Sequence, residues 1–312
     1  MRRSFLAGFA LAVLAGVLFL AGRSCLAPRP SPSASPPPLG PSLMSPSPSP
    51  SPSLPPLGLQ DRLQAEKNIA AAAALGEAAV PALAELCRKG SPLARRDALA
   101  ALERISPPAA CREAVEMLSG GNPILLDEAL AVCARARFRP AAEQVKRLLS
   151  HDDPLVRARA ALAAAFVLEK EALPLLLPLL EAPEAVVRDA AGRAVSALTY
   201  RDFGFAHSGF PADRAAAVRR IRAWLAKHGG ESRFAWLEAR VEECLLGLAS
   251  PDPFVRLDSK AFLTSVLGEI EYNPDDPPDR RLAAVAKARK RWLSFRPLLE
   301  KRPPLLLSLE AE

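Results

Sequence analysis

The hydrophobic and polar positions between residues 173 and 199 predict two helices separated by a short break. A leucine-rich run over residues 173–180 forms the first apolar stretch, and Glu-Ala-Pro-Glu at residues 181–184 interrupts it. Apolar side chains then recur every three to four positions, the period of a helix with one buried face, at Val186, Val187, Ala190, Ala191, Ala194, Val195 and Leu198. Because runs of β-branched residues alternating with polar ones are not found, the pattern favours an all-α fold.

This two-helix unit repeats every 31 residues. Prolines mark three successive unit starts, and alanine falls on one phase in four units: Pro92, Pro123 and Pro154, then Ala98, Ala129, Ala160 and Ala191. Arg95, Arg157 and Arg188 share another phase, where the second unit has Leu126. A fixed period is typical of stacked arrays, because one unit cannot bury its apolar face alone. We therefore predict an α-solenoid of stacked antiparallel helix pairs over residues 59–302, with residues 303–312 as a C-terminal tail.

After residue 198 the register changes and a longer unit of 68 residues follows. Val187-Arg188 recurs as Val255-Arg256, and Trp224 recurs as Trp292. Each longer unit contains an insertion, at residues 200–213 and 271–279. Repeat arrays place such insertions on one face, so we expect both on one edge of the solenoid. The residues of this candidate interaction edge are Asp202, Phe203, Phe205, His207, Phe210, Tyr272, Asn273, Asp275 and Trp292.

Residues 1–58 predict an N-terminal membrane or signal helix followed by a linker. The uncharged apolar core at residues 5–22 follows Arg2 and Arg3, and its length is at the short end of what spans a bilayer. Residues 1–27 therefore form a retained signal anchor, a cleaved signal peptide or a lipoprotein signal at Cys25. The first case gives a single-pass protein of the bacterial cell membrane with its repeats outside the cytoplasm, and the second gives export to the periplasm. Residues 28–58 hold 13 of the 32 prolines, which predicts a disordered Pro/Ser-rich linker.

The net charge of +7 is concentrated near the C-terminal end. Residues 279–302 contain nine Lys or Arg against two carboxylates, a local net charge of +7, so the remaining chain is close to neutral. Near-neutral repeats argue against nucleic acid as a partner. We interpret the basic segment as a polar cap that ends the stack, the alternative being a contact with anionic lipid or an acidic partner.

The histidines and cysteines do not form a recognisable chemical site. The three histidines are far apart and lack metal-ligand spacing with Cys, Asp or Glu, so we expect no metal, no cofactor and no catalytic residue. Four of the five cysteines fall on apolar helical phases, and we expect them to be small core residues: Cys87, Cys111, Cys133 and Cys244.

The repeats resemble the HEAT-like repeat family in its short bacterial form. The resemblance is carried by residues 79–83 and by the turns at 154–157 and 183–188, and it extends over about residues 60–270. It implies an α-solenoid that binds protein. It also implies that Arg157, Arg188 and Arg256 are structural and pair with an acidic residue of a neighbouring repeat. Leu126 occupies the arginine position of the second unit, so we expect the pairing to be lost there.

Together these features favour a non-enzymatic protein–protein interaction scaffold, membrane-tethered or exported, that binds through its concave face or its insertion edge. One alternative is a lyase-type enzyme, because related repeats occur in proteins that attach bilin pigments. A nucleic-acid-binding helical-repeat protein is the other alternative. An enzyme predicts a closed pocket with perturbed acids, a nucleic-acid binder predicts a basic concave face, and a scaffold predicts an exposed apolar or aromatic patch.

Overall fold

The computed structural model describes residue 69 and residues 76–307, and this part of the chain is helical throughout, without a strand. The N-terminal apolar segment, the proline-rich linker and the last five residues lie outside the described part. Within it, every helix is too short or too polar to cross a membrane.

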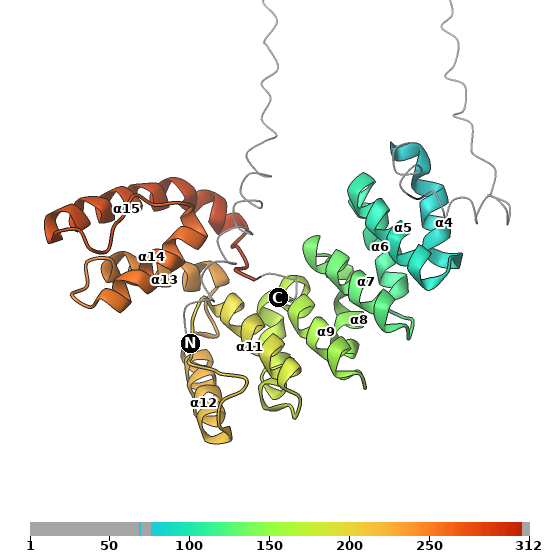
Figure 1. Ribbon diagram of the computed structural model, residues 1–312, viewed down its shortest axis with the longest axis horizontal. Helices are drawn as coiled ribbons and strands as arrows, with labels where there is room; N and C mark the ends of the chain where they lie inside the picture. The colour runs from blue at the N-terminus through green and yellow to red at the C-terminus, as the bar shows by residue number, and fades with distance from the viewer. Residues whose placement is uncertain (1–68, 70–75, 308–312) are drawn as a thin grey trace, which may run out of the picture.

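Four helix pairs form the first part of the array (Figure 1). They are α4 (Val80–Lys89) with α5 (Pro92–Ile105), α6 (Pro107–Met117) with α7 (Pro123–Arg135), α8 (Ala142–Leu148) with α9 (Pro154–Val167), and α10 (Leu173–Leu176) with α11 (Ala185–Thr199). Short 3-10 turns flank the first helices: η1 (Gly76–Ala79), η2 (Arg139–Ala141), η3 (Glu169–Ala172) and η4 (Pro178–Glu181). The second helices start at residues 92, 123, 154 and 185, so the sequence period is the spacing of these helices along the chain.

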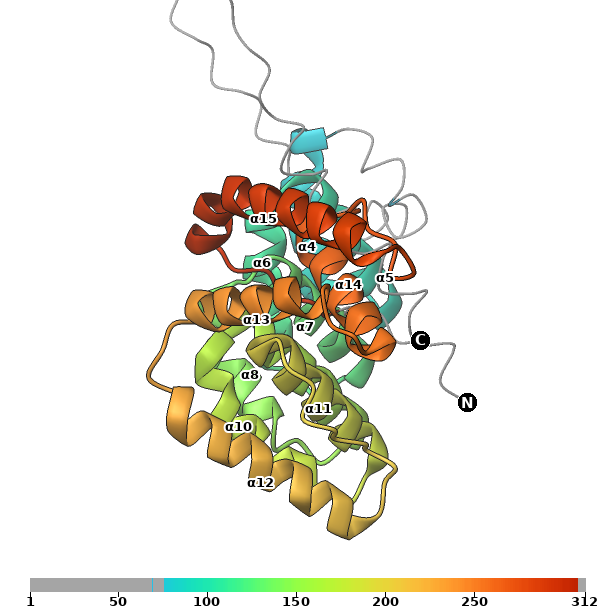
Figure 2. The same ribbon diagram turned by 90° about the vertical axis from the view of Figure 1, so that its left-hand side faces the viewer.

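The longer units add a third helix after each pair. α12 (Pro211–His228) follows α11, and α15 (Pro278–Lys301) follows the pair α13 (Arg233–Gly247) and α14 (Pro253–Leu267). α12 packs against η4, whereas α15 packs against α13 and α14. In Figures 1 and 2, α12 and α15 lie on opposite sides of the α13–α14 pair. Each extra helix therefore packs on its own unit, and the expectation that the two insertions share one edge stays a prediction.

The second helices other than α11 begin where the sequence supplies a cap and a proline. Asn122, Asp153 and Asp252 accept a hydrogen bond from the second helical N–H, at N–O distances of 3.1, 2.8 and 2.8 Å. Proline occupies the first helical position, where its missing N–H has no intrahelical partner to lose. The turns thus start the second helices at a fixed register.

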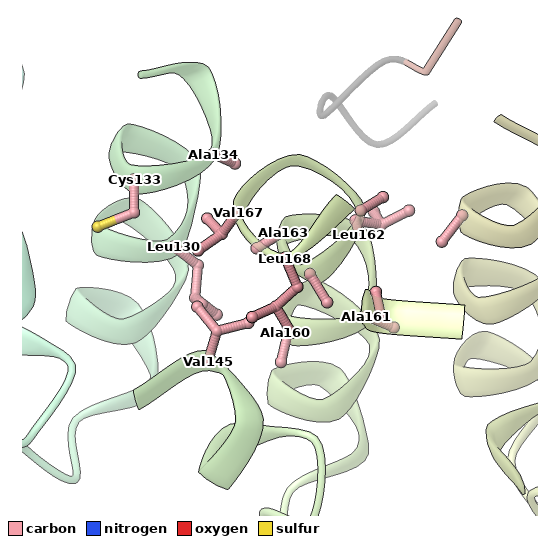
Figure 3. Close-up of a cluster of buried hydrophobic side chains, with 14 of the residues drawn as sticks. Leu130, Cys133, Ala134, Val145, Ala160, Ala161, Leu162, Ala163, Val167 and Leu168 are labelled. Carbon is pink, nitrogen blue, oxygen red and sulfur yellow. The ribbon is translucent and has the colours of Figure 1, made fainter. Parts of the chain in front are cut away.

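The core runs continuously between successive second helices. The alanines of the repeating phase are fully buried: Ala98, Ala129, Ala160 and Ala191. Their small side chains let α5, α7, α9 and α11 pack closely, since every methylene added at such a contact pushes the helices apart. Figure 3 shows Leu130 of α7, Val145 of α8 and Leu168 after α9 pointing toward one another beside these contacts. Leu126, which replaces the expected arginine, is fully buried in the same core.

Candidate interaction surfaces

Six helices carry an arginine at the fourth helical position, and each guanidinium donates to a main-chain carbonyl just before its own helix, in the preceding loop or, for Arg95, in the last turn of α4. The pairs are Arg95 to Cys87 (2.6 Å), Arg157 to His151 and Asp152 (2.7 and 2.9 Å), Arg188 to Ala182 and Pro183 (2.8 and 2.6 Å), Arg214 to Gly209, Arg256 to Ser250 and Pro251 (2.9 and 2.8 Å), and Arg281 to Asp276 (3.2 Å). The arginine therefore ties the turn between two helices to the helix that follows it.

The inter-repeat ion pair implied by the family resemblance is seen at Arg157, whose Nη2 lies 2.8 Å from a carboxylate oxygen of Glu184 in the next unit. The hydrogen bond from Arg157 lowers the pKa of Glu184. Arg188 uses its Nε differently and donates to the carbonyl of His207 at 2.9 Å. The predicted structural role of these arginines thus rests mainly on carbonyls rather than on carboxylates.

Arg214 and Arg281 have the same role but were not singled out from the sequence. Both follow a helix-starting proline by three residues, at Pro211 and Pro278, as Arg157 follows Pro154. The signal Pro-x-x-Arg was therefore present, but in the added helices it falls outside the 31-residue period.

An exposed apolar row follows the edge at which the second helices begin, which we call the helix-start edge. The second helical residue is apolar in each pair and 42–79% exposed: Leu93, Ile124, Leu155, Val186 and Phe254. Phe210, the residue before α12, is 79% exposed. Single exposed apolar residues are ordinary, but repetition at one position of each unit forms a line of them.

The opposite edge, where α7, α9 and α11 end, carries three strained residues. Arg137, Glu169 and Tyr200 have φ angles of 50°, 53° and 58°, which glycine adopts at less cost. Each is at or just after the cap of its helix. The left-handed conformation costs a non-glycine residue about 1–3 kcal/mol, so contacts of these side chains must stabilise it. We call this surface the helix-end edge.

Arg233, at the start of α13, joins these side chains into one polar cluster. Its Nη2 donates to the Tyr200 hydroxyl at 2.7 Å, and its Nη1 lies 3.6 Å from a carboxylate oxygen of Glu169. Arg137 approaches the other oxygen of Glu169 at 3.5 Å. Burial raises the pKa of Tyr200 to about 12, and burial followed by the charges of Arg302 and Arg233 lowers the pKa of Arg137.

The segment after α15 crosses this cluster. Arg137 donates to the carbonyl of Pro303 at 3.3 Å, and the Tyr200 hydroxyl and Arg233 donate to the carbonyl of Pro304 at 2.6 and 2.7 Å. Leu305, Leu306 and Leu307 are half-buried against the hydrophobic core. The beginning of the tail, residues 303–307, therefore packs back onto the solenoid.

The first insertion, residues 200–210, runs back along α11 and is held by internal contacts. The Asp202 carboxylate accepts from the Gly204 N–H at 2.7 Å, and His207 Nδ1 lies 3.1 Å from a carboxylate oxygen of Asp189. Phe203 packs edge-on against Trp224 with ring centroids 5.8 Å apart. Phe205 lies against α11 at Gly192, where an added Cβ would be 2.7 Å from its ring. Of the candidate residues in this loop, Asp202 and Phe210 are exposed, Phe210 to 79%.

Two residues predicted for the interaction edge, Tyr272 of the second insertion and Trp292 of α15, are core residues instead. Tyr272 is 6% exposed and donates its hydroxyl to the Leu248 carbonyl at 2.6 Å. Trp292 is 1% exposed and stacks on Phe234 with centroids 6.2 Å apart. Asn273 forms a local turn by accepting from the Asp275 N–H at 3.2 Å. Tyr272 and Trp292 therefore hold α13, α14 and α15 together and are not available to a partner.

The basic residues of α15 make contacts within the molecule. Lys287 pairs with Glu271 at 2.9 Å, Arg289 with Glu242 at 2.8 Å and Arg296 with Glu238 at 2.7 Å. Such exposed pairs are weak, but they neutralise part of the helix charge. The contacts favour the interpretation of α15 as the polar end of the stack.

The described cysteines are core residues. Cys87, Cys111, Cys133 and Cys244 are buried and are not in disulfides. Burial raises the pKa of Cys87, Cys133 and Cys244 to about 12. No group of three or more His, Cys, Asp or Glu placed to hold a metal ion occurs within the described residues.

We expect these four thiols to resist alkylation in the native protein. At pH 8 a pKa of about 12 leaves roughly one thiol in ten thousand ionised at Cys87, Cys133 and Cys244. Burial also raises the pKa of Cys111 and blocks access to all four thiols. In a Cys25→Ser chain, a disulfide-exchange dye at pH 8 should label none of the four within minutes and all four in denaturant. Rapid native labelling of any one would show an accessible thiol and favour the lyase alternative.

Comparison with known proteins agrees with the geometry of the array. No curated protein matches the sequence. Residues 112–196 match the family model for HEAT repeats, a stretch that runs from within α6 to near the end of α11. HEAT repeats commonly mediate protein–protein interaction. The stacked helix pairs agree with this match, which supports HEAT-like repeats over residues 112–196.

Proposed function

We propose that this protein is a non-enzymatic scaffold that binds a protein partner along the helix-start edge. The observation that carries the proposal is the apolar row, in which Leu93, Ile124, Leu155 and Val186 occupy the same position of four stacked units. Neighbouring packed helices lie about 8–10 Å apart, so these four side chains form a line roughly 30 Å long. A partner with a matching apolar face gains from covering all of them together.

The row is suited to binding another protein because its apolar side chains are exposed to solvent. Burying the exposed part of each side chain contributes roughly 1 kcal/mol, and repetition adds these contributions along the edge. Phe210 and Phe254, both 79% exposed, supply the large aromatic surfaces that are enriched at interfaces. Of the residues predicted for the insertion edge, Phe210 belongs to the helix-start edge.

The N-terminal residues extend the proposal to location. An apolar anchor at residues 5–22 and a Pro/Ser linker at 28–58 would hold the repeats outside the cytoplasm, tethered to the membrane or, after cleavage, exported. The lyase-type enzyme remains the alternative function. The buried cysteines with raised pKa values favour the scaffold over cysteine-dependent chemistry.

The test is a cross-linked affinity capture with the full chain and two triple variants. The edge variant carries Leu93→Ser, Leu155→Ser and Phe254→Ser. The matched control carries Leu175→Ser, Leu293→Ser and Leu298→Ser, which also remove three exposed leucines, 37–65% exposed, but not from the row. We expect a specific partner whose recovery falls at least tenfold with the edge variant and stays near the wild-type level with the control.

Retention of the same partner by the edge variant would contradict the assignment of the surface. Equal loss with both variants would indicate a nonspecific apolar contact and would also contradict it. Circular dichroism of all three proteins keeps unfolding separate from loss of binding.

A further inference from the structure

The helix-end edge offers hydrogen-bond donors to an extended segment. Arg137, Tyr200 and Arg233 present guanidinium and hydroxyl groups, and three of their hydrogen bonds reach the carbonyls of Pro303 and Pro304. Proline has no N–H, so a Pro-Pro segment presents acceptors alone at these residues. Donors on the protein and acceptors on the segment are therefore complementary, and proline restricts the segment to an extended form before it binds.

The edge also has donor capacity that the tail does not use. Arg233 is 5% exposed, yet its Nε and Nη1 have no hydrogen-bond partner, since Glu169 at 3.6 Å is within ion-pair range but too far for a hydrogen bond. Arg137 and Arg302 add positive charge near one carboxylate. A buried arginine with unsatisfied N–H groups is costly, so the bound tail leaves the site only partly satisfied.

The sequence contains the tail's motif again in the linker. Pro-Pro-Leu occurs at residues 37–39, 55–57 and 303–305. Residues 55–59 (Pro-Pro-Leu-Gly-Leu) and 303–307 (Pro-Pro-Leu-Leu-Leu) are identical at four of five positions. The difference is glycine for Leu306, which removes one of the three side chains that pack on the core.

We propose that the helix-end edge is a recognition site for extended Pro-Pro-Leu segments and that residues 55–59 of the same chain compete with residues 303–307 for it. Ile69 is helical and packs on the core, so the nine residues 60–68 connect the linker motif to the array, and fully extended they would reach about 30 Å. The edge extends over the second to fourth helix pairs, one to three units from the first pair, or roughly 10–30 Å at the spacing of packed helices. The linker motif can therefore reach the site within one chain.

Docking of residues 55–59 would attach the linker to the array and release the tail. The exchange requires no covalent change, because the same three side chains would donate hydrogen bonds to the carbonyls of either segment. It is also independent of the apolar row, which lies on the opposite edge, so failure of either proposal leaves the other intact.

The experiment measures fluorescence anisotropy of a labelled peptide of residues 53–61 added to the full chain. A tail variant carries Leu305→Ser, Leu306→Ser and Leu307→Ser, and a tail-and-linker variant adds Pro55→Ala, Leu57→Ser and Leu59→Ser. Since a tethered competitor acts at millimolar effective concentration, we expect the peptide to bind the tail-and-linker variant at least tenfold more tightly than the wild-type chain. The tail variant should fall between them.

Two controls test the chemistry of the site. A peptide with Pro55→Ala and Pro56→Ala gains two N–H donors and loses its restricted backbone, and it should bind at least tenfold more weakly. Tyr200→Phe in the tail-and-linker background removes one donor and should weaken binding about fivefold to tenfold, with the circular dichroism spectrum unchanged.

Three results would overturn the proposal. The first is peptide binding that is undetectable in the tail-and-linker variant while its helical spectrum is retained. The second is affinity that does not change with Tyr200→Phe. The third is a tail variant whose mass by light scattering doubles with concentration, because the linker motif would then bind a second copy rather than its own chain.

Discussion

Replacing Trp292 with alanine is expected to destabilise the C-terminal unit by about 3–5 kcal/mol. The indole is 1% exposed and stacks on Phe234, and with Ala288 it forms the buried stripe of α15. Truncation of a buried tryptophan leaves a cavity in addition to the lost transfer free energy, which gives this range. Urea unfolding followed by far-ultraviolet circular dichroism measures the change.

Phe210→Ala is the matched comparison for this prediction. Phe210 is an aromatic residue of the first insertion, but it is 79% exposed, and its truncation should change the free energy of unfolding by less than about 0.5 kcal/mol. A loss below about 1 kcal/mol at Trp292 would mean that α15 packs differently from the structure described. Because solenoid units unfold semi-independently, a separate early transition at Trp292→Ala also agrees with the expectation.

The repeating part of the fold was readable because its physical demands recur at a fixed period. Each of the four 31-residue units has an alanine where second helices touch, as at Ala160, and three of them have a proline where the second helix starts, as at Pro154. The arginine at the fourth helical position recurs for the same reason, since every turn has carbonyls to satisfy. Because these local requirements recur at a fixed spacing, they can be recognised in the amino-acid sequence alone.

The last helix was harder to interpret because it is covered on one side alone. In α15 the buried residues are Ala288 and Trp292, one turn apart, and the positions around them are charged. Such a narrow stripe gives only a weak periodic signal, so an aromatic residue in a basic helix suggested a surface residue. The structure buries Trp292 because α13 and α14 cover that stripe.

The helix-end edge could not be assembled from the sequence for a different reason. Arg137, Glu169 and Tyr200 occupy matching positions of successive units but differ in chemistry, so no periodic residue type marks them. Their shared property is a positive φ, which sequence patterns predict for glycine rather than for these side chains. The contact with Pro304 also joins residues 104 positions apart in the chain.

Replacing Arg188 with alanine is expected to cost about 2–4 kcal/mol of stability. Arg188 is 9% exposed and donates to three main-chain carbonyls, of Ala182, Pro183 and His207, so its removal leaves several acceptors without a partner. A lost hydrogen bond to a charged donor costs about 1.5–3 kcal/mol, and the three are not additive because they share one side chain. The midpoint of urea unfolding should fall while the slope stays constant.

Two further substitutions, Arg188→Lys and Arg219→Ala, complete the test of the role of Arg188. Arg188→Lys keeps the charge but replaces the planar fork with a single ammonium, so it should recover part of the loss and not all of it. Arg219→Ala removes an exposed arginine of α12 and should have an effect within about 0.5 kcal/mol. If Arg188→Lys restored full stability, the positive charge alone would explain the effect. The hydrogen bonds of the guanidinium to the main-chain carbonyls would then not be what holds the inserted loop to α11.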